Sequence, residues 1–509
     1  MASIQERLAE SLKELQKLQT ENGLAVIKSS DLSRTHLSRL LKNGFIQEVM
    51  KGWYITSRPD SLSGDTTNWY TSYWYFISEY ANSRFGEEWC LSADQSLSIY
   101  SGNRTVPKQV IIRVAKGTNN IANLLYGTSM LYFKSSIANP IYKEPQLGLN
   151  LYSLPEALLE CSPDFFRLDS VAARTCLAMV SDVGDIMKKV LENGNTTKAG
   201  RLAGAFRNIG HTSAADEIIN TMKSLGYDIR EEDPFKDRSS IEYSRITSPY
   251  VMRLKLMWNK MREVVISNFR ESKHTHTDID ACLKNIDAQY KLDAYHSLSI
   301  EGYKVTDELI EKVKIGNWKP DEESSDAEQR NAMAARGYWQ AFQVVKESTK
   351  KILKGENSGE VVDNDHRVWY RELFAPSVSA GLLKPADLAG YRTNQVYIHG
   401  SMHTPLNPKA VRDAMPVLFE LLKDEPDARV RTVLGHFMFV YIHPYMDGNG
   451  RIARFLMNTM LISGGYNWTV IPVEKRQEYM AALEKGSVNE DITDFTLFLA
   501  GLVNKSISD

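Results

Sequence analysis

The second half of the sequence repeats apolar residues at a helical period almost without interruption. From about Ser244 to Asp509, apolar side chains recur three and four positions apart, which is typical of amphipathic helices that pack on one another. The expected helices are 252–270, 278–295, 307–313, 327–352, 363–374, 411–422, 428–442, 449–462, 476–485 and 493–505. One stretch, GYRTNQVYIHG at 390–400, has the pattern of a short β-hairpin instead. The pattern predicts an all-α domain at 244–509 that carries one hairpin.

Residues 1–60 have the layout of a winged helix-turn-helix. A long helix at about Ser3–Asn22 and an apolar turn at 24–27 come first. Ser30 or Asp31 caps a short helix, Ser33 caps a second, and Gly44 ends it. Two short strands, 45–49 and 53–55, follow as a hairpin. Cations on the polar side of the second helix and on the wing suit contacts with DNA phosphates and bases. These candidates are Arg34, His36, Arg39, Lys42 and Lys51.

Residues 61–240 mix α and β patterns and show no chemical motif. The charged segment EEDPFKDRSS at 231–240 has the composition of a linker. We therefore expect a multidomain chain with boundaries at 1–60, 61–240 and 244–509. The fold class is a winged helix-turn-helix, a mixed α/β middle domain and an all-α C-terminal domain.

The overall composition is that of an ordinary globular protein. Hydrophobic residues make up 43% and charged residues 24% of the 509 positions, and the formal net charge is −2. The chain as a whole is therefore no electrostatic nucleic-acid binder. It contains no signal peptide, no apolar run of membrane length and only four scattered cysteines. We expect no membrane contact and a cytoplasmic location.

One stretch, GHFMFVYIHPYMDGNGRIARFLMNTML, carries the chemistry. Pro444 ends a helix, because the residue before a proline is pushed out of the α region. Residues 447–450, DGNG, form a tight turn that tolerates positive φ, and a second helix starts behind it. A glycine-rich turn that opens onto a helix N-terminus is a binding site for anions.

The side chains around this turn add the groups that phosphate chemistry needs. Arg451 and Arg454 lie on one face of the second helix and present guanidinium groups to phosphate oxygens. Asp447 is the kind of hard carboxylate that binds Mg²⁺ beside phosphates. His443 can accept a proton near neutral pH. The combination predicts phosphoryl or nucleotidyl transfer, although DGNG alone also suits an ordinary surface turn.

HPYMDGNGRIAR resembles the signature of the Fic family, with Tyr445 where phenylalanine is commoner. The resemblance extends over Ser244–Asp509 and implies a bacterial protein that transfers AMP from Mg²⁺-ATP to a Ser, Thr or Tyr hydroxyl of a target protein. Carried over by position, His443 is the general base and Asp447 holds Mg²⁺. Gly448, Asn449, Gly450 and Arg451 contact the α- and β-phosphates, and Arg454 the γ-phosphate.

SLSIEG, Ser297–Gly302, resembles the inhibitory motif of the self-inhibited Fic class. The resemblance implies that Glu301 pairs with Arg454 where the γ-phosphate belongs, with Ser297 and Gly302 as the other motif positions. The alternative is that Glu301 only caps or solvates a helix.

Two further segments resemble parts of Fic proteins. YRTNQVYIHG is similar to the hairpin flap that docks the target, which implies docking roles for Arg392, Gln395, Val396 and Tyr397. RQEYMAALEKGSVNED is similar to the segment around the nucleotide base, and Tyr479 is the candidate adenine contact. Helical spacing equally predicts that Tyr479 packs in the core.

The N-terminal half, about residues 10–235, resembles abortive-infection type antitoxins with a winged-helix head. This implies DNA binding, with protein docking as the alternative, and a homodimer suits such a head. Two other functions stay open for the whole chain. One is a transcription regulator with a Fic sensing module, and the other is removal of AMP or use of another nucleotide donor.

Overall fold

The computed structural model describes residues 3–22, 26–59, 65–237, 248–272, 274–315 and 326–508. The chain forms two compact units, Met1–Pro249 with Tyr397–Thr404, and Tyr250–Val396 with Pro405–Asp509. The expected domain boundaries at 60–61, 240 and 244 lie outside the described residues, so the three-domain division remains a prediction. No helix of the described part has the length and hydropathy of a membrane span.

The first unit begins with two helices and a small antiparallel sheet. The elements are α1 (Ile4–Asn22), β1 (Val26–Lys28), α2 (Arg34–Lys42), β2 (Ile46–Met50) and β3 (Trp53–Thr56), and the strand order is β1-β3-β2. The Ser33 hydroxyl caps α2 by accepting a hydrogen bond from the backbone N–H of His36 (3.3 Å). Two expectations were wrong: residues 26–27 form a strand, and a turn replaces the short helix before Ser33. The strand forms because Val26 and Ile27 pair with β3 and are buried.

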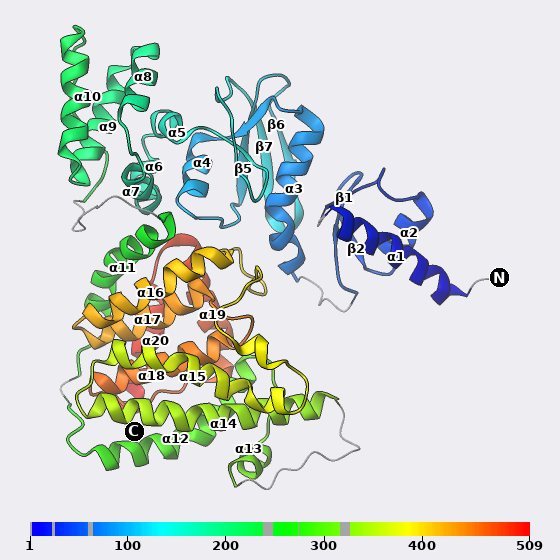
Figure 1. Cartoon of the computed structure of the whole chain (residues 1–509), viewed down its shortest axis with the longest axis vertical. Coiled ribbons are helices and arrows are strands. Elements are labelled where there is room, and N and C mark those ends of the chain that lie inside the picture. The colour runs from blue at the N-terminus through cyan, green and yellow to red at the C-terminus, as the bar shows by residue number, and fades with distance from the viewer. Residues whose placement is uncertain are drawn as a thin grey trace. The chain divides into compact units, whose positions relative to one another are not determined.

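A mixed α/β region follows in the same unit. It comprises α3 (Thr67–Phe85), β4 (Trp89–Leu91), α4 (Ala93–Tyr100), β5 (Gln109–Val114), β6 (Asn120–Asn123), β7 (Ser129–Lys134), β8 (Tyr142–Lys143) and β9 (Asn150–Leu151). The strands β4-β5-β7-β6 form one sheet, in which only β5 and β7 run parallel. Aromatic side chains of α3, such as Trp69 and Phe76, pack in one core with Val110 and Ile112 of β5, and Figure 1 shows α3 beside this sheet.

The first unit ends in short helices. They are α5 (Leu154–Glu160), α6 (Phe165–Leu168), α7 (Ser170–Ala178), α8 (Gly184–Asn193), α9 (Thr196–Asn208) and α10 (Thr212–Ser224). Gly200 and Gly204 of α9 let the backbone of residues 230–233 pack against the helix, because a Cβ at either glycine would lie about 2 Å from a carbonyl oxygen of that segment (1.9 and 2.2 Å). The first residues of the expected linker at 231–240 therefore pack against α9.

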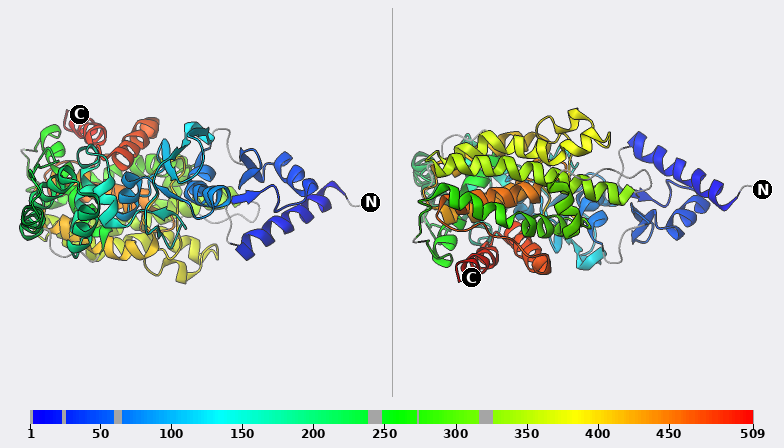
Figure 2. Two further views of the ribbon diagram at one scale, coloured as in Figure 1. Left: turned by 90° about the horizontal axis from the view of Figure 1, so that it is seen from above. Right: turned by 90° about the horizontal axis from the view of Figure 1, so that it is seen from below.

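The second unit is helical, as the sequence predicts. Its helices are α11 (Pro249–Asn268), α12 (Ile279–Ile300), α13 (Asp307–Lys314), α14 (Asp326–Leu353), α15 (Ser358–Ser379), α16 (Pro408–Asp424), α17 (Ala428–Ile442), α18 (Asn449–Ser463), α19 (Arg476–Asn489) and α20 (Thr493–Ser508). Nearly every side chain of α17 and α18 is buried, so these two helices are the centre of the unit. Figure 2 shows α14 and α15 alongside one another on its outside.

The stretch Gly390–Gly400 contains no strand, contrary to the expected hairpin. Its polar groups are satisfied in another way. The Arg392 guanidinium donates to the carbonyl groups of His443 (2.7 Å), Asn394 (2.9 Å) and Leu406. Only the Asn394 carbonyl belongs to the stretch itself, and the Arg392 side chain otherwise attaches the stretch to carbonyl groups outside it.

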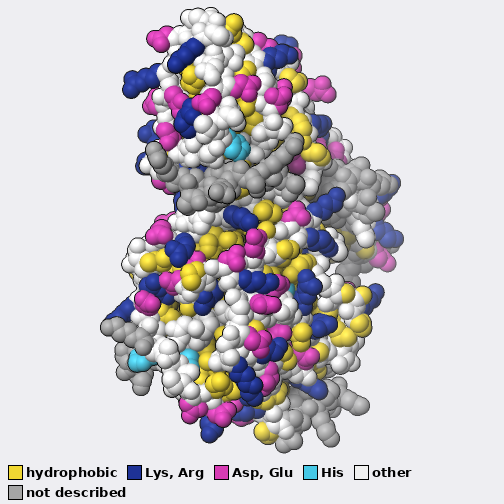
Figure 3. Space-filling view, turned by 60° about the vertical axis from the view of Figure 1, so that its left-hand side comes forward, with side chains coloured by type: hydrophobic (Ala, Val, Ile, Leu, Met, Phe, Trp, Pro, Cys, Tyr) yellow, Lys and Arg dark blue, Asp and Glu magenta, His cyan; other side chains and the backbone are white. Residues whose placement is uncertain are grey.

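Charged side chains of both signs lie intermingled on the molecular face in Figure 3. This face shows no large area of a single sign, which agrees with the nearly balanced total of 61 basic and 63 acidic residues.

Candidate active site

The loop between α17 and α18 depends on two residues with left-handed backbone. His443 ends α17 with φ 55°, and Gly448 precedes α18 with φ 80°. Such values suit glycine but are uncommon for other residues. A Cβ at Gly448 would lie 2.8 Å from the Phe374 ring, so the turn also needs glycine for space. Both predicted helix boundaries are confirmed by the structure, whereas the turn predicted at 447–450 ends earlier, because Asn449 and Gly450 already belong to α18.

The Asn449 side chain closes this loop. Its Oδ1 accepts a hydrogen bond from the Tyr445 backbone N–H (2.9 Å), and its Nδ2 donates to the Tyr445 carbonyl (2.9 Å). The Tyr445 ring is buried and stacks on Tyr370, with ring centroids 3.8 Å apart. Asn449 therefore holds the shape of the loop with its side chain, and only its backbone N–H is left for an anion.

His443 is held in the tautomer and charge state of a base. Its Nδ1 lies 3.2 Å from the Val440 carbonyl. Because a carbonyl only accepts, Nδ1 carries the proton and Nε2 keeps its lone pair. Burial lowers the pKa of His443 to about 4, and the Arg392 cation acts in the same direction. The imidazole is therefore neutral at physiological pH and able to take a proton.

Arg451 is a buried cation without hydrogen-bond partners. Its side chain is 1% exposed, and none of its three guanidinium nitrogens has a hydrogen-bond partner among the described residues. Asp447 forms an ion pair with it, Oδ2 to Nη2 3.3 Å, but the Asp447 side chain is 60% exposed. Unsatisfied buried N–H groups are costly, so this arrangement fits an anionic ligand.

The same observations test whether a Mg²⁺-nucleotide fits here. The described residues contain no cluster of three or more His, Cys, Asp or Glu side chains that could hold a metal by themselves. Mg²⁺ bound beside phosphates needs only one or two carboxylates and takes its other ligands from phosphate and water. Asp447, whose side chain is 60% exposed and lies next to the Arg451 guanidinium, meets that requirement.

Arg454 is occupied by the SLSIEG segment at the end of α12. Its Nε donates to the Ser297 hydroxyl (2.8 Å), and its Nη2 donates to the Ser297 carbonyl (3.0 Å) and to Glu301 Oε1 (2.7 Å). The Arg454 side chain is 3% exposed and that of Glu301 is 25% exposed. The predicted pairing of Glu301 with Arg454 is thus present, across 153 positions of sequence.

The Glu301 carboxylate stays ionised in this place. Burial by itself raises its pKa, but Arg454 and Arg451 outweigh burial, so the pKa is lowered overall. A Cβ on Gly450 would lie 2.4 Å from Glu301 Oε1. The second glycine of the DGNG turn therefore leaves the space that the carboxylate fills.

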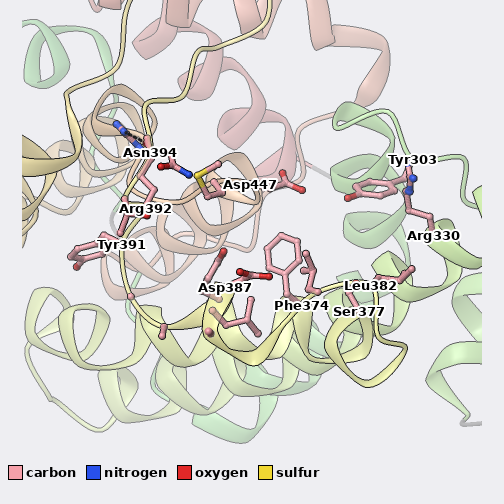
Figure 4. Close-up of a pocket in the computed structure, with 18 residues that line it drawn as sticks. Tyr303, Arg330, Phe374, Ser377, Leu382, Asp387, Tyr391, Arg392, Asn394 and Asp447 are labelled. Atoms are coloured by element: carbon pink, nitrogen blue, oxygen red, sulfur yellow. Dashed lines mark hydrogen bonds between the residues drawn. The ribbon is translucent and has the colours of Figure 1, made fainter. Parts of the chain in front are cut away.

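A cavity of about 610 Å³ opens beside Asp447. Figure 4 shows Asp447, Phe374 and Asp387 around its middle, Tyr391 and Arg392 on one side, and Tyr303 with Arg330 on the other. All of its lining residues belong to the second unit. Because its volume is typical of ligand sites, it has room for a substrate next to the loop.

Tyr479 lies within the core. Its side chain is 1% exposed, and its hydroxyl is 2.8 Å from His436 Nε2. His436 Nδ1 faces the Ala453 carbonyl (3.0 Å), so Nε2 is the acceptor and the tyrosine donates. This burial favours the packing role of Tyr479, which helical spacing predicts equally with the adenine contact.

The four flap candidates are divided between the two units. Arg392 is 3% exposed and binds backbone carbonyls, and Gln395 Nε2 donates to the carbonyls of Val396 (3.1 Å) and Pro405 (2.9 Å). Tyr397 belongs to the first unit, whereas the other three belong to the second. Arg392 and Gln395 therefore brace the chain beside His443, and their docking role stays a prediction.

The five DNA candidates divide into two groups. His36 Nδ1 lies 2.9 Å from the Ser11 hydroxyl, and Arg39 Nη1 donates to the Arg7 carbonyl (2.7 Å). Both side chains thus hold α2 against α1. The candidates that remain exposed are Arg34, Lys42 and Lys51.

Sequence reasoning missed two aromatic side chains that contact Arg451. The guanidinium carbon lies 5.2 Å from the Tyr303 ring centroid and 5.0 Å from that of Phe374. Tyr303 directly follows SLSIEG, so its position could have drawn attention to it. Phe374, on α15, has no local signal, because its approach to the loop is purely tertiary.

The site lies on the central helix pair α17 and α18, where the two buried arginines of α18 meet the loop that carries His443 and Asp447. The family description that matches is the Fic/DOC family, over residues 364–461. Residues 364–461 therefore form a Fic/DOC family domain, and the predicted resemblance is confirmed over that stretch.

Relatives with similar sequences carry the name of an enzyme. Protein adenylyltransferase fic-1 of Caenorhabditis elegans is 32% identical over 124 residues, 24% of each chain. Protein adenylyltransferase Fic of Drosophila willistoni is 34% identical over 131 residues, 25% of this chain and 26% of that one. The chain thus matches these relatives over about a quarter of their length. Both come from animals, and they give no support to a bacterial source.

Solved structures of Fic proteins are similar as well. C. elegans Fic-1, residues 134–508, is 21% identical, with a TM-score of 0.38, and the match covers 67% of this chain and 96% of that one. A Fic-domain protein from Bacteroides thetaiotaomicron is 17% identical, with a TM-score of 0.34 and coverage of 51% and 95%.

Proposed function

We propose that this protein is an adenylyltransferase that moves AMP from ATP to a Ser, Thr or Tyr hydroxyl of a target protein. The observation that carries the proposal is the buried Arg451 guanidinium at the start of α18, which has no hydrogen-bond partner among the described residues and lies near the neutral His443 imidazole. The matching relatives, named protein adenylyltransferases, support it.

The residues of the loop divide the work of the reaction. His443 Nε2 removes the proton of the target hydroxyl as its oxygen bonds to the α-phosphorus, and the bond from that phosphorus to pyrophosphate breaks. The backbone N–H groups after Gly448 and the Arg451 guanidinium bind phosphate oxygens. Asp447 would hold Mg²⁺, which neutralises phosphate charge when bound.

We also infer that the chain inhibits itself through Glu301. The carboxylate occupies Arg454 at 2.7 Å, and its negative charge repels any phosphate that approaches the same guanidinium. A triphosphate can use Arg454 only after Glu301 has left it.

Transfer of radiolabel tests the proposed function. Wild type and Glu301→Gly are incubated with Mg²⁺ and either α-³²P-ATP or γ-³²P-ATP, and label on protein is counted. Adenylyl transfer labels protein from the α position only. Label from γ points to phosphate transfer, and no label with ATP bound favours a sensing module that regulates transcription. Loss of label from a previously modified target indicates removal of AMP.

The kcat/KM of transfer is expected not to fall around the ordinary pKa of histidine as the pH is lowered. A base acts in its neutral form, and the pKa of His443 is lowered to about 4. In Glu301→Gly, kcat/KM should therefore stay level from about pH 8 to about pH 6 and fall only toward the pKa. The Glu301 carboxylate raises the pKa of His443. The change Glu301→Gly removes this charge, so the pKa of His443 stays lowered in the variant. A midpoint near 6.5 would show an ordinary, solvated histidine. Circular dichroism at each pH separates titration from unfolding.

We propose DNA binding as a second function, because Arg34, Lys42 and Lys51 are exposed on one helix and its wing. Binding of the full chain to duplex DNA should weaken as salt rises. Replacing all three by alanine should reduce the slope of log K against log salt by roughly 2–3. His36→Ala, whose side chain faces α1, is the matched control. An unchanged slope in the triple variant would assign this head to protein docking.

A further inference from the structure

The Arg451 guanidinium is held by two aromatic rings from separate parts of the second unit. Its carbon lies 5.2 Å from the Tyr303 ring centroid and 5.0 Å from the Phe374 ring centroid, within cation–π distance. An aromatic face attracts the positive charge but accepts none of the N–H groups in an ordinary hydrogen bond. The rings therefore contact the guanidinium without taking its donors: none of the three nitrogens has a hydrogen-bond partner among the described residues, although Nη2 lies 3.3 Å from Asp447 Oδ2.

The end of α12 explains why Tyr303 reaches Arg451. The Gly302 N–H donates to the Ser299 carbonyl (3.0 Å), and the Tyr303 N–H donates to the Leu298 carbonyl (3.1 Å). Gly302 has φ 89°. Together these features form a Schellman motif, in which glycine takes the left-handed position and the next residue turns back over the helix. The backbone of this turn directs the Tyr303 ring.

The same turn contacts both arginines that the proposed function assigns to phosphates. The Glu301 carboxylate forms a direct ion pair with Arg454, in which Nη2 donates to Oε1 at 2.7 Å. Tyr303, two residues later, faces Arg451 with a neutral ring. A carboxylate excludes a phosphate from its arginine, whereas a π face leaves the N–H groups open to one. The two residues should therefore have opposite effects on nucleotide binding.

We propose that Tyr303 is a positioning residue for the nucleotide polyphosphate, which it serves by holding Arg451 in place. The inference rests on the proposed function and adds to it that the inhibitory turn is also part of the nucleotide site. Glu301 and Tyr303 act in opposite directions from one turn. Removing the whole turn would then release inhibition and damage binding together.

The test uses the full-length Glu301→Gly protein with Tyr303→Phe or Tyr303→Leu added. Binding of ADP and of adenosine is measured by calorimetry, and KM for ATP and kcat by α-³²P transfer. Leucine keeps a smaller apolar side chain but removes the π face, and should weaken ADP binding and raise KM by roughly tenfold. Adenosine binding, kcat and the melting temperature should change little. Phenylalanine should restore ADP binding, and Lys304→Ala, the exposed next side chain, should leave it unaffected.

Several outcomes would overturn the inference. Tighter ADP binding or faster transfer in Tyr303→Leu would show that the Tyr303 ring hinders access of phosphate to Arg451. Equal weakening by leucine and phenylalanine would transfer the effect to the hydroxyl group. Should the leucine variant melt early, Tyr303→Met provides the same comparison. One outcome separates the two proposals: ADP binding depends on the Tyr303 ring, but Glu301→Gly transfers no AMP. This result would support the positioning role of Tyr303 and reject the proposed function.

Discussion

Replacing Glu301 with glycine is expected to raise AMP transfer by roughly 5- to 150-fold, the usual range of coupling between competing sites. The carboxylate pairs with the almost fully buried Arg454 at 2.7 Å, so any phosphate must first displace it. The pair is strong because both groups stay ionised: the Arg454 and Arg451 cations lower the pKa of Glu301 despite its burial. Label transferred from α-³²P-ATP per minute measures the effect.

Two companion variants separate release of Arg454 from other consequences of the change. Glu301→Gln keeps the size of the side chain but removes its charge, and should give a smaller increase. Arg454→Ala added to Glu301→Gly should abolish the gain, because the freed cation is what the phosphate needs. Transfer that is equal in wild type and Glu301→Gly, with ATP equally well bound, would reject Glu301 as an inhibitor.

Replacing His443 with alanine in the Glu301→Gly background is expected to reduce transfer by roughly 10²- to 10⁴-fold, the usual contribution of a general base. ATP affinity should stay within about twofold, because the phosphate donors come from Arg451, Arg454 and the start of α18. Single-turnover transfer gives the rate, and calorimetry gives the affinity. Retained transfer would remove His443 from the role of base.

The backbone of His443 calls for a second variant. Its φ is 55°, and asparagine tolerates the left-handed region better than alanine does. His443→Asn should therefore keep the loop and lose the base, with the same fall in rate. Arg451→Ala is the converse control, since it should weaken ATP binding. If His443→Asn also lost ATP affinity, the histidine would have to be assigned to the loop structure.

Local patterns in the sequence were sufficient to predict the helices around the site. The predicted segment 428–442 coincides with α17, and 449–462 differs from α18 by one residue. These helices follow from apolar periodicity, Pro444 and the glycine turn, which act over a few residues. The hairpin at 390–400 was mispredicted, because the Arg392 side chain within it donates to the carbonyl groups of His443 and Leu406, which lie outside the stretch and its pattern.

By itself, the sequence determined the residue types that gather at the DGNG turn, because His443, Asp447 and the two arginines are neighbours along the chain. It also indicated Glu301, through a motif. Only the tertiary structure decided which of these groups are paired: Glu301 and Ser297 bind Arg454 from 153 and 157 positions away, while Arg451 has aromatic rings from two elements and no hydrogen-bond partner. The physical reason is that charge pairing and burial depend on distance in space, and the packing of α12 and α15 against α18 sets those distances.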